Sequence, residues 1–253
     1  MANYTSLQHY WRCHLRWVWY HEGWQPIAEP EPLTVGRLVH QAIACHYTGV
    51  SWEPVLPDTN DVKEAKRLNQ MVGRAKALSS RWIQERAARY RPLLVEGRVA
   101  WTVNGATAEG HPDLVAFGFE PPGCIHLVDF KTGTKTDIRA VVHTGQADYY
   151  AYLLLMAENL QVDFCTYEVI NDDLMMTYQY VPNLERGAYL ANEVLDLDTG
   201  PKSLDGPRFL WDCHFCPYFD PCWVKETGGD WKTMFETGTQ YRRRGMKDEA
   251  LGD

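Results

Sequence analysis

Two aspartates and a lysine stand at the ends of neighbouring predicted strands. Asp129 and Lys131 close the apolar stretch 124–131 and, because side chains alternate along a strand, share one face while Phe130 points to the other. Asp113 opens the preceding apolar segment, and a hairpin-like return would bring it beside Asp129. Such carboxylates suit Mg²⁺ or Mn²⁺, and Lys131 could stabilise developing charge or help to deprotonate water. The alternative is a weak surface ion pair between Asp129 and Lys131.

The order of polar motifs along the chain carries more information than any one of them. It runs Gly36-x-x-x-His40, Gly110-x-x-Asp113, Asp129-x-Lys131 and Gln146-x-x-x-Tyr150. This series resembles the RecB-like branch of the PD-(D/E)XK nucleases over about residues 34–170. The resemblance implies a metal site made by His40, Asp113, Asp129 and the backbone carbonyl of Phe130. It also implies that Lys131 assists phosphodiester hydrolysis.

Three further side chains are candidates for the same site. Gln146 and Tyr150 are four residues apart on a predicted helix, so they share a face and could orient the lysine, the water or a phosphate. Their alternative is a place in the helix interior. Glu96 lies in the first predicted strand, where related nucleases often carry a glutamate, and its alternative is a salt bridge with Arg98.

Closely spaced cysteines form a partial metal cradle in the last part of the chain. Cys213, Cys216 and Cys222 give C-x2-C-x5-C, and a tetrahedral zinc site or a cuboidal cluster needs a fourth ligand, for which Cys13 is the candidate. The segment around Cys13 resembles the N-terminal part of the Cas-four iron-sulphur nucleases and of the AddB nuclease domain. That resemblance implies a structural 4Fe-4S cluster on these four cysteines. The alternatives are zinc, with His14 or His214 substituting, or reduced thiols.

The other three cysteines, Cys45, Cys124 and Cys165, fall in apolar segments and are expected in the core. The total of seven is odd, and in a reducing compartment such a set favours metal binding over disulfides.

A basic helix is predicted within residues 61–91. This segment holds nine basic and three acidic residues, a local charge of +6 within a chain whose net charge is −8. Arg67, Arg74 and Arg81 are seven apart, so they form a stripe along one side of the helix. The stripe predicts a track for DNA phosphates, and a solvated charged face is the alternative.

The elements that position these residues follow from hydrophobic periodicity and turn signals, among which Asn104-Gly105 predicts a hairpin. The expected helices span 6–24, 34–47, 61–90, 141–159 and 183–195, and the expected strands span 93–103, 107–119, 124–131, 162–170 and 174–181. This order predicts an α/β fold with a central mixed sheet flanked by helices. The resemblance implies a restriction-endonuclease-like core.

We expect three regions along the chain. Residues 1–33 would supply an N-terminal helix to the iron-sulphur module, 34–200 would form the nuclease core with the basic insertion 61–91, and 201–253 would hold the cysteine cluster and a tail.

Composition limits the class of protein. With 253 residues, 45% of them hydrophobic, the chain can bury a large core, which excludes a disordered tail and a disulfide-stapled miniprotein. The longest apolar run, 149–157, is far below the roughly 20 residues that cross a bilayer. Residues 1–20 lack a signal-peptide pattern, so we expect a cytoplasmic protein without membrane partners.

These observations predict a metal-dependent deoxyribonuclease, an exonuclease on single-stranded DNA or DNA ends. The resemblance points to CRISPR adaptation, phage DNA processing or recombination, with proteins of those processes as partners. The alternative is a catalytically idle subunit that binds DNA or a partner and keeps a zinc or iron-sulphur site.

Overall fold

The computed structural model describes residues 2–26, 31–54, 56, 61–133, 138–200, 216, 218, 222, 228 and 241–243. The chain divides into two compact units. One unit comprises Met1–Glu29 and Glu193–Asp253, and the other comprises Pro30–Asn192.

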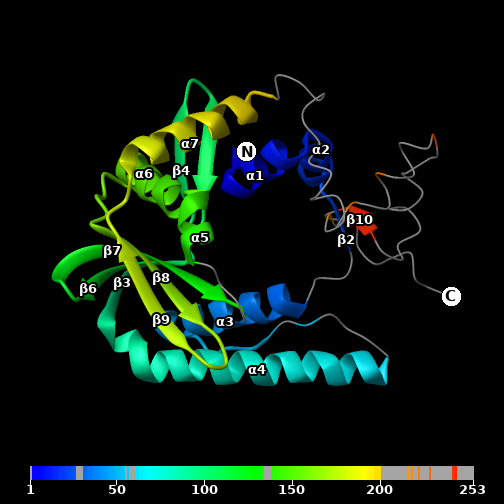
Figure 1. Cartoon of the computed structure of the whole chain (residues 1–253), viewed down its shortest axis with the longest axis vertical. Coiled ribbons are helices and arrows are strands. Elements are labelled where there is room, and N and C mark those ends of the chain that lie inside the picture. Colours follow the sequence, from blue (N-terminus) through cyan, green and yellow to red (C-terminus); the bar gives the residue numbers. More distant parts are fainter. Residues whose placement is uncertain are drawn as a thin grey trace. The chain divides into compact units, whose positions relative to one another are not determined.

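A five-stranded mixed sheet forms the centre of unit Pro30–Asn192 (Figure 1). Its strand order is β3-β6-β7-β8-β9, and every neighbouring pair is antiparallel except β7 and β8, which are parallel. The mixed α/β fold expected from the sequence is therefore confirmed. The strands are β3 Tyr90–Val95, β6 Leu114–Phe119, β7 Pro122–Thr132, β8 Phe164–Ile170 and β9 Met175–Tyr180.

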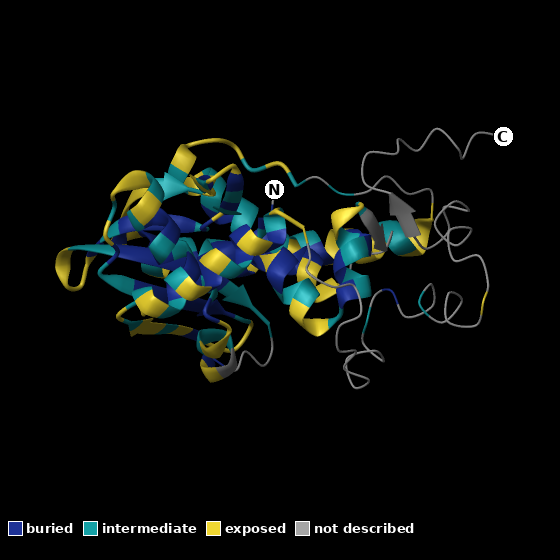
Figure 2. Cartoon of the chain, turned by 90° about the horizontal axis from the view of Figure 1, so that it is seen from above, coloured by how far each residue is buried: buried dark blue, intermediate teal, exposed yellow. Residues whose placement is uncertain are grey.

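Helices α3 (Glu31–Thr48) and α4 (Val62–Arg86) lie side by side in Figure 1 and pack on one face of this sheet. Asp61 caps α4, since its side chain accepts a hydrogen bond from the N–H of Lys63 at 2.8 Å. The core between helices and sheet includes Leu38, Val39, Trp82, Val128 and Phe130. Figure 2 shows buried positions in dark blue on the strands and on the inner sides of the helices.

Two strands expected to be continuous are each divided. The first part of the expected strand 93–103 belongs to β3, which ends at Val95, and its last part forms β4 (Val99–Val103). Between them Glu96 has φ +46, a left-handed conformation that a strand does not accommodate. The expected strand 107–119 likewise becomes β5 (Ala106–Gly110) and β6. Strands β4 and β5 form the hairpin predicted at Asn104-Gly105, where both residues have positive φ.

The expected helix 141–159 is also divided in two. It consists of α5 (Ile138–Thr144) and α6 (Gln146–Glu158), because Gly145 takes φ +77 between them. Helix α4 ends earlier than expected, at Arg86, and the 3-10 turn η1 (Ala87–Arg89) leads into β3. Helix α7 (Leu184–Asp198) matches the last expected helix.

The described part of the other unit contains two short helices, three short strands and the last residues of α7, 193–198. Helices α1 (Tyr4–Arg12) and α2 (His14–His21) replace the single helix expected over 6–24, because the backbone at Cys13 is extended. Strand β10 (Tyr241–Arg243) pairs antiparallel with β2 (Trp24–Pro26), and β1 is Ala2–Asn3. None of the helices in the described residues is long and apolar enough to cross a membrane.

Candidate active site

The pairing of β6 with β7 brings Asp113 and Asp129 together. Leu114 lies opposite Val128 in this antiparallel pair, so Asp113, one residue earlier, stands beside Asp129. The N–H of Phe130 donates to Oδ2 of Asp113 at 2.8 Å. Phe130 itself is 2% exposed in the helix-covered core, as alternation predicted, and Asp129 and Lys131 belong to the opposite face.

His40 and Glu96 complete a group around Asp113. Nδ1 of His40 lies 3.3 Å from Oδ1 of Asp113. The N–H of Glu96 donates to the carbonyl oxygen of Asp113 at 2.9 Å, which fixes Glu96 across from that aspartate. One ligand atom from each of the three side chains lies within 4.8 Å of the others. Arg98, the alternative partner for Glu96, instead forms an ion pair with Glu109 at 2.9 Å.

Lys131 is held by several neighbours. Its Nζ lies 2.6 Å from Oδ2 of Asp129 and donates to Oε1 of Gln146 at 3.4 Å. Nε2 of Gln146 donates in turn to the hydroxyl oxygen of Tyr150 at 3.1 Å. Nζ also lies 5.9 Å from the ring centre of Tyr167. Of the predicted pair, Gln146 therefore contacts Lys131 through its side-chain amide, and Tyr150 holds that amide in place.

No pattern in the sequence linked Tyr167 to the site. It is fully buried in β8 and lies opposite Asp129 only because β7 and β8 pair in parallel. That pairing depends on the crossover through α5 and α6, which hydrophobic alternation within one strand does not reveal.

Two of the motif glycines are explained by close packing around this group. A Cβ atom on Gly36 would lie 2.7 Å from Oγ1 of Thr132, the residue after Lys131. A Cβ atom on Gly110 would lie 2.6 Å from the ring of Tyr150. Helix α3 therefore approaches the end of β7, and Tyr150 of α6 approaches β5, more closely than a side chain on either glycine would allow.

The ionisable groups of the site strongly shift one another's pKa values. Burial lowers the pKa of His40, but the charge and hydrogen bond of Asp113 and the charges of Asp129 and Glu96 outweigh it and raise the pKa to about 9. Burial raises the pKa of Asp113, but the charge and hydrogen bond of His40, followed by Lys131, hold it below its ordinary value. Burial raises the pKa of Asp129 to about 6 against the charge of Lys131.

Glu96 is exposed, yet desolvation and the charge of Asp113 raise its pKa to about 7. Burial is the larger cause of the raised pKa values of Glu96 and Asp129, and repulsion between the carboxylates adds to it. A divalent cation would relieve that repulsion. Imidazole nitrogen and carboxylate oxygens are donors that Mn²⁺ accepts readily, and the carboxylates also suit Mg²⁺. The residues present therefore fit a divalent metal ion.

A cavity of about 440 Å³ opens onto this group. His40, Glu96 and Lys131 line it, and α3 adds Arg37 and Gln41. Neither residue was singled out in the sequence, although Arg37 stands three residues before His40 and therefore shares its side of the helix. The cleft thus combines two of the candidate metal ligands, His40 and Glu96, with Lys131, an additional cation and an amide.

The three arginines of the stripe on α4 all contact acidic residues. Arg67 lies 3.7 Å from Glu31 and 3.4 Å from Glu64. Arg74 forms an ion pair with Asp172 at 2.5 Å. Arg81 forms one with Glu85 at 3.4 Å and donates to the backbone oxygen of Asp172 at 3.3 Å. Arg74 and Arg81 therefore share one side of α4, as predicted, and DNA binding by the stripe stays a prediction.

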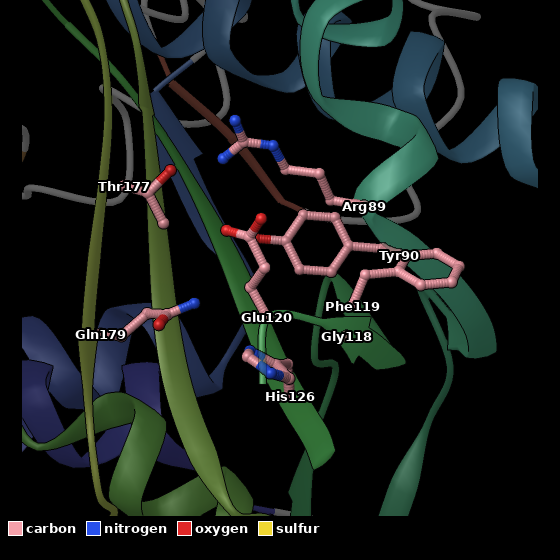
Figure 3. Close-up of a pocket in the computed structure, with 8 residues that line it drawn as sticks. All are labelled: Arg89, Tyr90, Gly118, Phe119, Glu120, His126, Thr177 and Gln179. Carbon is pink, nitrogen blue, oxygen red and sulfur yellow. The ribbon is translucent and has the colours of Figure 1, made fainter. Parts of the chain in front are cut away.

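A second cavity, of about 250 Å³, lies on the sheet face that carries Phe130 (Figure 3). His126 lines it from β7 and Thr177 and Gln179 line it from β9. His126 and Phe130 are four positions apart on β7 and so belong to the same face, opposite to that of Asp129. None of the candidate metal ligands lines this cavity, which separates it from the site.

The cysteines are placed only in part. Cys13 lies between α1 and α2, and Cys216 and Cys222 pack on the cluster of Trp19 and Tyr218. Cys213 lies outside the described residues. Within the described part of the chain, the cysteines form no group of ligand atoms comparable to that around Asp113. Cys165 is buried as expected, whereas Cys45 and Cys124 are only partly buried and do not belong to the core.

Comparisons with known proteins agree with this geometry. The model of the PD-(D/E)XK nuclease superfamily matches residues 2–222, and no curated protein matches the sequence. A crystal structure of a candidate exonuclease from Eubacterium rectale has a TM-score of 0.58 at 13% identity, covering 87% of this chain and 86% of that one. This likeness shows the fold alone.

The structure of SSO0001 is 16% identical, and the match covers 73% of this chain and 82% of that chain. Its TM-score of 0.39 adds no argument. The family match is different in kind, because it spans most of the chain and includes all the residues gathered around Asp113 and Lys131. The chain belongs to the PD-(D/E)XK nuclease superfamily.

Proposed function

We propose that this nuclease is a Mg²⁺- or Mn²⁺-dependent deoxyribonuclease of the RecB-like branch. One observation carries the proposal: ligand atoms of His40, Glu96 and Asp113 lie within 4.8 Å of one another, next to the ion pair of Asp129 with Lys131. An isolated surface ion pair would not need a histidine, two further carboxylates and a cleft beside it.

The side chains would divide the work. His40 and Asp113 would hold the metal ion, and Glu96, the third member of their group, is close enough to contribute. The resemblance to the RecB-like nucleases adds Asp129 and the carbonyl of Phe130 as ligands. Such an ion supplies a water nucleophile at neutral pH and neutralises phosphate charge. Lys131 would stabilise negative charge on the phosphate or accept a proton from the attacking water.

The neighbours of Lys131 would act by positioning it. Asp129, Gln146 and Tyr167 approach Nζ from three elements, β7, α6 and β8. Tyr150 fixes the Gln146 amide through a hydrogen bond of 3.1 Å. A lysine held in this way loses little conformational freedom when the phosphate arrives.

The substrate we infer is single-stranded DNA or DNA ends, cleaved as by an exonuclease. The arginine stripe on α4 supports a polyanionic substrate. The similar structure from Eubacterium rectale is that of a candidate exonuclease. The resemblance to the Cas-four and AddB nucleases supports CRISPR adaptation, phage DNA processing or recombination, with partner proteins from those processes.

We also infer a structural 4Fe-4S cluster on Cys13, Cys213, Cys216 and Cys222. The spacing of the last three supports it, as does the division of the chain, which puts Cys13 in one compact unit with residues 193–253. Cys216 and Cys222 pack against Trp19, six residues after Cys13.

The deciding experiment is cleavage of end-labelled single-stranded and duplex DNA with Mg²⁺, Mn²⁺ or EDTA. We expect cleavage with metal ion alone, and its loss in Asp113→Asn and in Lys131→Ala. Glu158→Gln, a change at an exposed carboxylate at the end of α6, is the matched control and should cleave normally.

Cleavage that survives both substitutions would refute the site. Metal-independent binding of DNA without any cleavage by the wild type would instead favour the idle DNA-binding subunit.

A further inference from the structure

Arg74 holds Asp172 in a two-point contact. Nε of Arg74 donates to Oδ1 and Oδ2 of Asp172 at 3.3 and 3.1 Å, and Nη2 donates to Oδ2 at 2.5 Å. Nη1 of Arg81 donates to the backbone oxygen of the same aspartate at 3.3 Å. One residue of the turn between β8 and β9 therefore engages two of the three arginines in the stripe.

The turn presents Asp172 in a fixed conformation. The N–H groups of Asp173 and Leu174 donate to Oδ1 of Asn171 at 3.2 and 2.7 Å, and the N–H of Asn171 donates to the carbonyl of Leu174 at 3.1 Å. In Figure 1 the turn between β8 and β9 reaches α4. The carboxylate is thus delivered to the helix by a preformed loop.

Arg74 also lies close to the candidate cleft. It lines a cavity of about 50 Å³ together with Pro32 and Thr132, and both of these residues also line the cleft that contains His40 and Lys131. Thr132 directly follows Lys131 on β7. Arg74 therefore lies beside the residue that follows Lys131, at the edge of the candidate cleft.

A guanidinium that binds a carboxylate through two N–H groups can bind a phosphate in the same way. The pair is also accessible, with side chains 33% and 50% exposed for Arg74 and Asp172. Ion pairs with that exposure contribute little to folding, so the carboxylate can be exchanged for another anion.

We propose that Asp172 occupies the place of a DNA phosphate on Arg74, and that Arg74, when released, binds a phosphate of the strand that lies in the cleft. The inference rests on the proposed nuclease function. It adds that Asp172, a residue of the protein itself, competes with DNA for Arg74. Asp172 makes entry of DNA depend on displacing the turn from α4. Removing the carboxylate should therefore strengthen DNA binding, and removing the guanidinium should weaken it.

The test is the affinity of the full chain for a fluorescent single-stranded oligonucleotide in EDTA, measured across a range of KCl concentrations. Asp172→Asn should tighten binding by about two- to fivefold, the strength typical of an exposed pair. Arg74→Gln should weaken it and reduce the salt slope by about one. Adding Asp172→Asn to Arg74→Gln should give no further gain, because the pair no longer exists.

Asp173→Asn is the matched control, since it removes the same charge from the neighbouring exposed position in the turn. If Asp172→Asn weakens binding, or tightens it no more than Asp173→Asn does, the proposal is overturned. Thermal unfolding of each variant separates loss of folding from loss of binding. A wild type that cleaves DNA while both turn variants bind alike would reject this inference alone, whereas a wild type that neither binds nor cleaves DNA would reject the proposed function with it.

Discussion

The carboxylate of Asp113 accepts a hydrogen bond from the main-chain N–H of Phe130 at 2.8 Å. A side chain at the start of β6 is thereby tied to the backbone of β7, between Asp129 and Lys131. The other oxygen of Asp113 remains 3.3 Å from His40. The position of this carboxylate is therefore set by strand register, and the protein alone arranges the group that could hold a metal ion.

Asp113→Asn and Asp113→Ala should separate charge from position. Asparagine can still accept the hydrogen bond from Phe130 but carries no charge, so we expect loss of metal-dependent cleavage and, at pH 10, where His40 has lost its own charge, near-normal stability. Alanine leaves the Phe130 N–H without this acceptor and should lower the free energy of unfolding by about 1–3 kcal/mol more. Urea unfolding in EDTA measures the difference. Equal destabilisation by both substitutions would contradict the structural role of the hydrogen bond.

The ion pair of His40 with Asp113 should make the stability of the metal-free protein depend on pH. The pKa of His40 is raised to about 9, so its stabilising effect is complete below pH 6.5 and is lost as pH rises through about 9. The difference in unfolding free energy between wild type and His40→Ala should be about 1–3 kcal/mol at pH 6 and should shrink by pH 10. Urea titrations in EDTA measure this difference.

Glu96 needs a control in that experiment, because its pKa is raised to about 7 and it titrates in the same window. The comparison is therefore repeated in a Glu96→Gln background. A His40 contribution that stays constant from pH 6 to 10 in both backgrounds would show that folding does not raise the pKa of His40.

Local patterns predicted the parts of the site that depend on one element. Alternation put Asp129 and Lys131 on one face of β7, and the four-residue step put Gln146 beside Tyr150 on α6. The seven-residue step likewise placed Arg74 and Arg81 on one side of α4. Each of these relations depends only on the geometry of a single helix or strand.

Contacts between different helices and strands could not be predicted from the sequence. The break at Glu96 is coupled to a hydrogen bond with Asp113, seventeen positions further on, so periodicity could not locate the end of β3. The approach of Tyr167 to Lys131 depends on parallel pairing, and the contacts of Arg74 and Arg81 with Asp172 depend on a turn that is remote in the sequence. Long-range packing decides such contacts, and propensity does not encode it.

Replacing Gly36 by alanine should slow cleavage, because the new methyl group would collide with Thr132. A second substitution at Thr132 should relieve the collision. In Gly36→Ala the new Cβ would lie 2.7 Å from Oγ1 of Thr132 and would displace the strand that carries Lys131. A shift of this kind can lower the cleavage rate by about tenfold or more. Adding Thr132→Ala should restore much of the rate, because the remaining Cβ of Thr132 lies 4.0 Å away.

Thr132→Val is the control for that rescue, since valine keeps a group of similar size in place of the hydroxyl. The double variant Gly36→Ala with Thr132→Val should stay slow. A rate restored equally by valine and alanine would show that the hydroxyl of Thr132 is not the obstacle.

The proposed cluster predicts a coloured protein. When purified without oxygen, the full chain should be brown and should contain iron and acid-labile sulphide in equal amounts. Cys216→Ala should remove the colour and lower thermal stability, because a clip between Cys13 and the C-terminal cysteines restricts the unfolded chain. Cys45→Ala is the matched control, since both thiols are partly buried and Cys45 lies outside the motif. A colourless wild type with one zinc ion per chain would replace the cluster by a zinc site, and equal effects of the two substitutions would show that Cys216 binds no metal.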